Sequence, residues 1–173
     1  MKASGFRAQG DFQEAAIWYR KAANLGHADA QCALAWMYET GTGVRLDKAE
    51  GYKWYFMAAG QGNAEAQLAV GLVLASGVAV KKDRIGAEFW FRQSAGQGCA
   101  EAMYQLGKLY AQGYGSGGSG ENKLCEAYKW FQLAAGHGVA RALPCLRALE
   151  QKMSQIQISE ALLQVAEFQK KRD

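Results

Sequence analysis

The stretch GYKWYFMAAGQGNAEAQ, residues 51–67, contains the pattern that decides the fold. Its segment AAGQGNAEA is close to the G-x-G-x-x-A fingerprint found in dinucleotide-binding loops: Gly60 and Gly62 have the right spacing, and alanines stand on either side of the last position, which is Glu65. Three consecutive aromatic residues, Trp54, Tyr55 and Phe56, stand just before it. The stretch therefore has two interpretations, a phosphate cradle beside a stacking platform or the turn between two packed helices.

An internal repeat runs through the chain. Trp18, Trp54, Trp90 and Trp130 lie 36, 36 and 40 residues apart. Each Trp is followed directly by Tyr or Phe, by two small residues four and five positions on, and by glycine eight positions on. Because so many columns keep one register, the chain is predicted to be an array of about four repeats of 36–40 residues.

Each repeat contains two helical patterns. One extends from Asp47, a favoured N-cap residue, to about Ala59, and the other from about Ala64 to Ala75. A G-x-G turn separates them, and a glycine loop follows at Gly77. One hairpin is too small to bury its own apolar face, so we expect an all-α fold. The hairpins are predicted to be antiparallel and to stack into a right-handed α-α superhelix, or solenoid.

Composition narrows the classes of function. The chain has 173 residues, half of them apolar, and a net charge of +4. Its Lys and Arg residues are scattered until KKR at 170–172, which predicts no nucleic-acid partner. No apolar run reaches the length of a membrane span. The start, MKASGFRAQGDF, lacks the apolar core of a signal peptide, so the compartment stays open: cytoplasmic, or periplasmic or secreted if a signal was removed.

Cysteine and histidine usage predicts neither a metal site nor a cofactor. No C-x-x-C occurs, and both histidines stand beside glycines. We expect free, partly buried thiols and solvated loop histidines, with no catalytic group. The residues are Cys32, Cys99, Cys125 and Cys145, and His27 and His137.

Carboxylates recur at the start of one helix in each repeat, as Asp29, Glu65 and Glu101. Negative charge is favourable at that end of a helix dipole. We therefore interpret them as helix-start residues and not as a ladder of metal ligands.

The repeated pattern resembles the Sel-1-like repeat (SLR), a relative of the tetratricopeptide repeat. The resemblance rests on AEAMYQLGKLYAQGYG (100–115), YETGTGVRLDKAEGYKWYFMAAGQG (38–62) and ASGVAVKKDRIGAEFWFRQSAGQG (75–98), and it covers about residues 5–150. It implies a single SLR solenoid domain over 1–173. The repeat array would span about 5–152, and a capping helix at about 156–171 would close it. The family implies an adaptor or regulatory role, often in bacteria.

The start of the chain departs from the pattern. Gly5 aligns with Gly41 and Gly77, so Met1–Ser4 is expected to be the tail of a helix that precedes a glycine loop. Asp11 would then be the N-cap of the next helix. This alignment suggests a piece of a longer array.

Two further features differ from the family pattern. The loop GYGSGGSGENK has four extra residues, and its Gly/Ser segment at 115–120 is either native or an engineered scar. Some members of the family pin each hairpin with a disulfide between recurring cysteines. Here the four cysteines occupy four different columns, so that pairing is not expected.

The repeat also gives the opening stretch one interpretation. Its glycines follow an amphipathic helix and recur as GQG at 96–98 and GHG at 136–138, which is typical of helix C-caps. A dinucleotide loop would instead follow a buried strand. The aromatic run is a repeat column and is expected to be buried between hairpins.

By analogy with tetratricopeptide arrays, the first helix of each pair lines a concave groove. Trp36 is the one tryptophan outside the Trp column, and its counterparts are Leu72, Lys108 and Ala148. It either contacts a partner or fills a local gap, and both readings stay open. The predicted partner-binding residues are Cys32, Trp36, Glu39, Leu68, Leu72, Tyr104, Gln105, Lys108 and Gln112.

The leading hypothesis is a non-catalytic module that binds a protein or peptide partner in this groove. One alternative is a structural scaffold that self-associates through the ends of the array. A second is an enzyme with a small site around Cys32 or His27.

Overall fold

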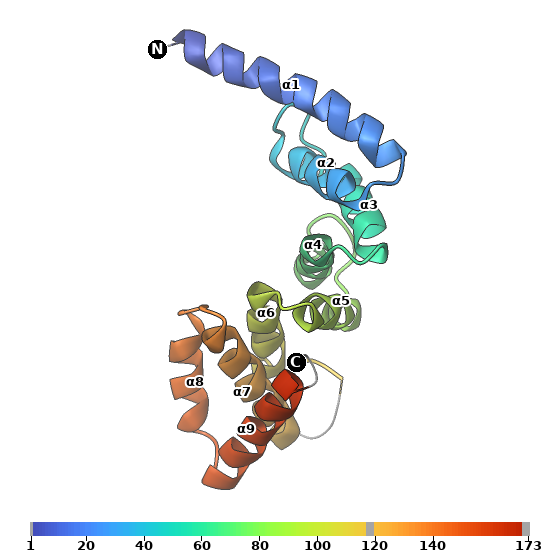
Figure 1. Ribbon diagram of the computed structural model, residues 1–173. Helices are drawn as coiled ribbons and strands as arrows, with labels where there is room; N and C mark the ends of the chain where they lie inside the picture. Colours follow the sequence, from blue (N-terminus) through green and yellow to red (C-terminus); the bar gives the residue numbers. More distant parts are fainter. Residues whose placement is uncertain (1, 117–119, 171–173) are drawn as a thin grey trace. The chain divides into compact units, whose positions relative to one another are not determined.

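The regular secondary structure of the described residues is entirely helical. The computed structural model describes residues 2–116 and 120–170, and these contain nine α-helices and no strand (Figure 1). The all-α class is thus confirmed. The chain forms two compact units, Met1–Asp83 and Arg84–Asp173. In chain order the helices are α1 (Lys2–Asn24), α2 (Ala28–Thr40), α3 (Lys48–Gly60), α4 (Ala64–Ser76), α5 (Arg84–Gly96), α6 (Ala100–Ala111), α7 (Gly120–Gly136), α8 (Ala142–Glu150) and α9 (Gln155–Lys170).

The predicted capping residues begin the helices of the opening stretch. The Asp47 carboxylate accepts hydrogen bonds from the backbone N–H groups of Ala49 and Glu50, at 3.1 and 3.0 Å. The Asn63 side-chain oxygen accepts from the N–H of Ala66 at 2.9 Å. These bonds satisfy donors that the first helical turn leaves without partners.

The G-x-G segments are turns at helix ends, as predicted. Gly60 is the last residue of α3, and Gly62 has φ = 94°, a left-handed conformation that favours glycine. The second glycine of each equivalent segment, at 98 and 138, has φ of 95° and 90°. The glycines therefore reverse the chain between helices.

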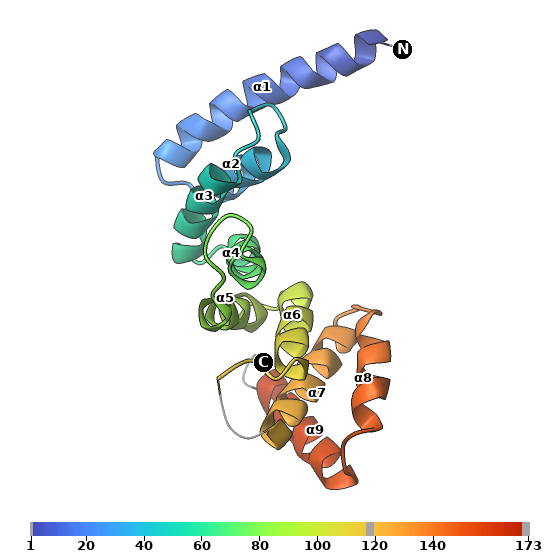
Figure 2. The same ribbon diagram turned by 180° about the vertical axis from the view of Figure 1, so that it is seen from behind.

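In the first unit, the most extensive packing is between α2 and α3 (Figure 2). Gly51 makes this approach close, because a Cβ added there would lie 2.9 Å from the carbonyl oxygen of Ala35. Tyr55, one turn further along α3, is buried. Small residues thus let the two backbones approach while an aromatic ring fills the space beside them.

In the second unit, α7 contacts α6, α8 and α9. A Cβ added to Gly107 on α6 would lie 2.6 Å from Cδ1 of the buried Phe131 ring on α7. On another side of α7, the rings of Trp130 and Phe168 meet edge to face with centroids 5.2 Å apart. Helix α9 is therefore docked on α7 by an aromatic pair.

The predicted helix break near Gly5 is wrong. Helix α1 continues from Lys2 to Asn24, so Asp11 lies inside a helix. The equivalent residues Asp47 and Asp83 each donate their backbone N–H to a carbonyl of the preceding helix, at 2.9 Å. Among the described residues no such bond anchors Asp11.

The expected burial of the Trp column holds at one end of the series and fails at the other. Trp130 is 2% exposed, whereas Trp18 is 61% exposed. Trp54 and Trp90 are partly buried. The next column is the buried one: Tyr55, Phe91 and Phe131 are core residues. Within each unit this aromatic packs against the helix before it, as Tyr55 and Phe131 show, and α1 has no such helix among the described residues.

The C-terminal helix lies close to the predicted place, over Gln155–Lys170. Of the Gly/Ser segment at 115–120, residues 117–119 lie outside the described residues. Both origins of that segment therefore stay predictions.

Glycine-to-alanine substitution should have opposite effects at two helix positions. Gly107→Ala places a methyl group against the buried Phe131 ring and should destabilise the protein by about 1–3 kcal/mol. Gly10→Ala meets no atom within 4 Å and should stabilise α1 by about 0.5–1 kcal/mol. Urea unfolding followed by circular dichroism measures both. A destabilised Gly10→Ala variant would contradict an uninterrupted α1.

Trp130→Ala should cost roughly 3–5 kcal/mol, because it removes a buried side chain and its contact with Phe168. Trp18→Ala should cost less than about 1 kcal/mol, because the side chain is mostly exposed and contacts Lys21. The same unfolding measurement compares the two variants. Equal losses would show that the Trp column is uniformly structural.

Candidate functional site

Two of the predicted groove residues, Cys32 and Trp36, line one open hollow of the first unit. The hollow has a volume of about 520 Å³ and lies between α2 and α4, with one residue of α3. Volumes of this order are typical of sites that admit side chains or small molecules. Its lining residues are Asp29, Cys32, Ala33, Trp36, Tyr55, Glu65 and Ala69.

Trp36 lines this hollow with its side chain 49% exposed. Its backbone oxygen accepts a hydrogen bond from Thr40 Oγ1 at 2.8 Å, within the same helix. A tryptophan that filled a gap in the core would be buried. The exposure therefore favours the surface reading over the gap-filling one.

Cys32 and Tyr55 are the protonated groups of the hollow. Burial raises the pKa of the Cys32 thiol to about 11, and the carboxylates of Glu65 and Asp29 add to the shift. Burial and then Glu39 raise the pKa of Tyr55, whose hydroxyl donates to Glu39 Oε2 at 3.1 Å. A reactive cysteine needs a thiolate, so this environment disfavours Cys32 as a nucleophile at neutral pH.

A second hollow, of about 260 Å³, shares Tyr55 with the first. It contains Glu39 and the partly exposed Leu72, two of the predicted groove residues. The Tyr55–Glu39 hydrogen bond therefore lies where the two hollows adjoin. Leu68 is half-buried on α4 and is outside the lining of both.

The remaining predicted residues belong to the second unit. The guanidinium of Arg141 lies 4.5 Å from the centroid of the Tyr104 ring, and Lys108 Nζ lies 5.8 Å from it. Gln105 Nε2 donates to Glu101 Oε1 at 2.8 Å. Three of these predicted side chains are thus already engaged with neighbours.

Gln112 is exposed, directly after the end of α6. It completes the set of predicted groove residues in the second unit.

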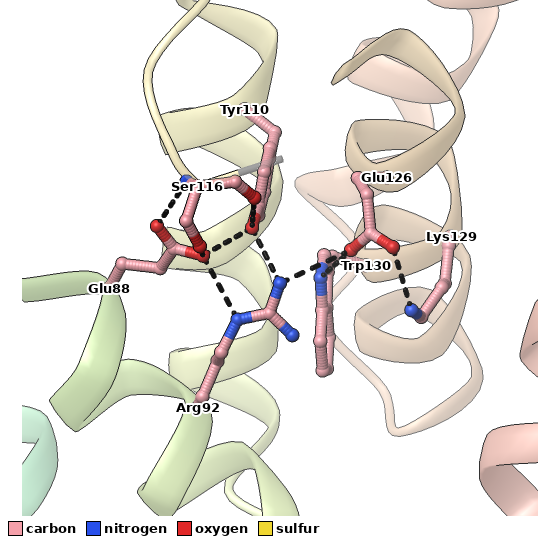
Figure 3. Close-up of polar contacts among 7 residues, drawn as sticks. All are labelled: Glu88, Arg92, Tyr110, Ser116, Glu126, Lys129 and Trp130. Carbon is pink, nitrogen blue, oxygen red and sulfur yellow. Dashed lines mark hydrogen bonds and ion pairs between the residues drawn. The ribbon is translucent and has the colours of Figure 1, made fainter. Parts of the chain in front are cut away.

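A buried polar network in the second unit was missed by the sequence reasoning (Figure 3). Glu88 on α5 is 2% exposed, and the Tyr110 hydroxyl donates to its Oε1. Ser116 donates its backbone N–H to Oε2 at 2.6 Å and its hydroxyl to Oε1 at 2.7 Å. Arg92 Nε donates to Oε1 at 3.0 Å. The carboxylate thus holds the segment after α6 against α5.

The network continues through Arg92 toward α7 (Figure 3). Arg92 Nη2 donates to the Tyr110 hydroxyl at 2.5 Å and lies 3.6 Å from Glu126 Oε2. That oxygen also accepts from Trp130 Nε1 at 2.9 Å. Burial acts to raise the pKa of Glu88, but the hydrogen bonds from Tyr110, Ser116 and Arg92 outweigh it and lower the pKa below its ordinary value.

A sequence signal for this network does exist in the register. Tyr110 follows Glu88 by 22 residues, and Glu150 follows Tyr128 by the same interval. The Tyr128 hydroxyl donates to Glu150 at 3.1 Å. The same acid–phenol pair therefore occurs in both repeats, but with the two residue types at swapped positions. Comparing these two columns would have predicted the pair.

The described residues contain no cluster of three or more His, Cys, Asp or Glu side chains that could hold a metal ion. No helix in the described ranges is long and apolar enough to cross a membrane. The four cysteines are free thiols, as predicted, with Cys32 and Cys125 buried. Both histidines are exposed in inter-helix turns.

A family model described as Sel1 repeat matches residues 4–27, 28–63, 64–99 and 100–139. A Sel1 repeat protein from Oxalobacter formigenes is 36% identical, with a TM-score of 0.69 over 78% of this chain and 53% of that one. A protective antigen with an SLR fold from uropathogenic Escherichia coli strains is 30% identical, with a TM-score of 0.77 over 95% of this chain and 37% of that one. The chain thus spans about half or less of these proteins. No curated protein matches it.

Glu88→Gln should cost about 1–3 kcal/mol at neutral pH, because an amide cannot accept from all the donors around it. Since folding lowers the pKa of Glu88, the carboxylate stabilises the fold above pH 4.5, and this contribution is lost as the pH falls through the lowered value. Wild type should therefore lose more stability than Glu88→Gln between about pH 5 and about pH 3 in urea unfolding.

The matched control for this experiment is Glu167→Gln, an exposed change on α9. It should follow wild type at every pH. Parallel acid losses in wild type and Glu88→Gln would show that the Glu88 network does not stabilise the fold.

Proposed function

The chain belongs to the Sel1 repeat family, and from this premise we propose that it is a non-catalytic adaptor that binds a segment of a partner protein in the hollow between α2 and α4. Sel1 repeats are generally protein–protein interaction modules, and their fold is typically a scaffold without catalysis.

The exposure of Trp36 at the hollow carries this proposal. Tryptophan is enriched among the residues that dominate binding energy, because it combines a large apolar surface with few rotatable bonds. About half of this side chain is still open to solvent, so a partner has apolar area left to cover. No requirement of the repeat explains a tryptophan at this position, where the other repeats have Leu, Lys and Ala.

The rest of the lining suits an inserted side chain. Ala33 and Ala69 are small, which leaves room between α2 and α4. The hydroxyl of Tyr55 is fixed by Glu39 before any partner arrives. A rigid wall reduces the entropy that binding must remove.

Self-association is the second candidate function, and the exposed apolar side chains of α1 favour it. Phe12, Ile17, Trp18 and Tyr19 all expose more than two fifths of their side chains. Large exposed apolar side chains of this kind are available for contacts with a second copy. Sedimentation of the Trp18→Ala variant beside wild type over a range of concentrations tests this: a concentration-dependent assembly that weakens in the variant supports it, and a monomer throughout rejects it.

Trp36→Ala should abolish most binding of peptides selected from a random peptide library on the full chain. We expect the affinity to fall by at least about tenfold, because a half-exposed tryptophan gives up its remaining surface on binding. Fluorescence anisotropy of labelled peptides measures the affinity. Phe56→Ala is the matched control, since Phe56 is an aromatic of similar exposure in the same unit. Equal effects of the two variants, or none, would reject the hollow as the binding site.

A further inference from the structure

The charged side chains that line the hollow between α2 and α4 are all acidic. They are Asp29 on α2 and Glu65 on α4, and Glu39 lies beyond Tyr55. The whole chain has the opposite balance, with a net charge of +4. The charge of the hollow's lining is therefore opposite in sign to the net charge of the chain.

These three carboxylates are also free of ion pairs within the part of the chain that the structure describes. Asp29 accepts a hydrogen bond from the neutral amide of Asn63 at 2.8 Å, and Glu39 accepts from Tyr55. Four other glutamates do pair with lysine or arginine: Glu50, Glu88, Glu101 and Glu126. The protein thus neutralises several acidic side chains elsewhere and leaves those of the hollow open.

The two carboxylates of the hollow also act on a neighbouring group. After burial, the Glu65 and Asp29 charges are the causes that raise the pKa of Cys32. A field that disfavours a second negative charge favours a positive one at the same place. It also disfavours acidic segments and nucleic-acid phosphates as occupants.

Trp36 adds a second feature that suits a cation. The face of an indole attracts a guanidinium, which can stack on it and also bond to carboxylates through its planar array of donors. Asp29, Glu65 and Trp36 line one hollow from two helices. We propose that the partner segment inserts an arginine side chain into this hollow, where its guanidinium faces the two carboxylates and stacks on Trp36.

This inference rests on the proposed binding function and narrows it to one class of partner. The acidic lining favours a positively charged side chain. The indole of Trp36, together with Ala33 and Ala69, covers the aliphatic stem of the inserted arginine. A lysine ammonium can pair with the carboxylates but has no planar face to stack on the indole, so a lysine peptide should bind more weakly than an arginine peptide.

The test uses peptides selected from a random library on the full chain. We expect the selected peptides to be rich in arginine, and Arg→Gln in such a peptide should weaken binding at least about tenfold. Arg→Lys should weaken it less. Raising the salt concentration should also weaken binding, since the attraction is between charges that remain partly solvated.

The protein side of the test is a matched pair of double variants. Asp29→Asn with Glu65→Gln should weaken binding at least about tenfold. Glu14→Gln with Glu167→Gln removes the same charge from exposed positions on α1 and α9 and should change binding less than twofold. Glu65→Gln alone changes an exposed side chain, so its binding can be measured even if the first double variant does not fold.

Two outcomes distinguish a failure of the arginine proposal from a failure of the proposed binding function. Peptides that bind in a Trp36-dependent way but contain no arginine or lysine, or that ignore the Asp29 and Glu65 changes, would overturn the inference and leave the proposed function standing. Peptides whose binding ignores Trp36→Ala would overturn the proposed function itself.

Discussion

The close approach of successive helices within each unit is the constraint on which the rest of the structure depends. A small residue on one helix faces a backbone or an aromatic ring on the next, as Gly51 does at Ala35 and Gly107 at Phe131. This contact uses the side of α2 or α6 that faces the following helix. Positions of these helices outside that contact are less constrained by packing, so they are free to differ between repeats. Trp36 and Lys108 are two such positions.

The size of the side chains at these less constrained positions decides where a hollow forms. On α2 and α4 the equivalent positions are Ala33 and Ala69, and the space between them stays open. On α6 the same column holds Gln105, which bonds to Glu101, and beside it the Tyr104 ring packs near Arg141 and Lys108. The first unit therefore presents an unfilled acidic hollow, whereas the face of α6 satisfies its own charges and aromatic ring.

The sequence could predict what every repeat shares, because periodicity records contacts that recur. It predicted α3 and α4 to within a residue or two, the cap at Asp47 and the turns at the G-x-G segments. It could not predict the uninterrupted α1 or the exposure of Trp18, because both depend on a neighbour that the other repeats possess and α1 lacks among the described residues. Two residues of the hollow, Cys32 and Trp36, were predicted from the register, but the acidic character of the hollow depends on which charges meet in space.

Departure from the repeat does not by itself mark a functional residue, as Glu88 and Trp36 demonstrate together. Both break the pattern of their columns. Glu88 is buried, and its carboxylate is satisfied within the fold by hydrogen bonds from Tyr110, Ser116 and Arg92. Trp36 is half exposed, and no lysine or arginine of the described residues forms an ion pair with the carboxylates that share its hollow. A buried group that departs from the repeat must be satisfied locally, because an unpaired one would destabilise the protein. An exposed group carries no such penalty, so surface left uncovered and charge left unpaired at such a position are the better guide to where a partner binds.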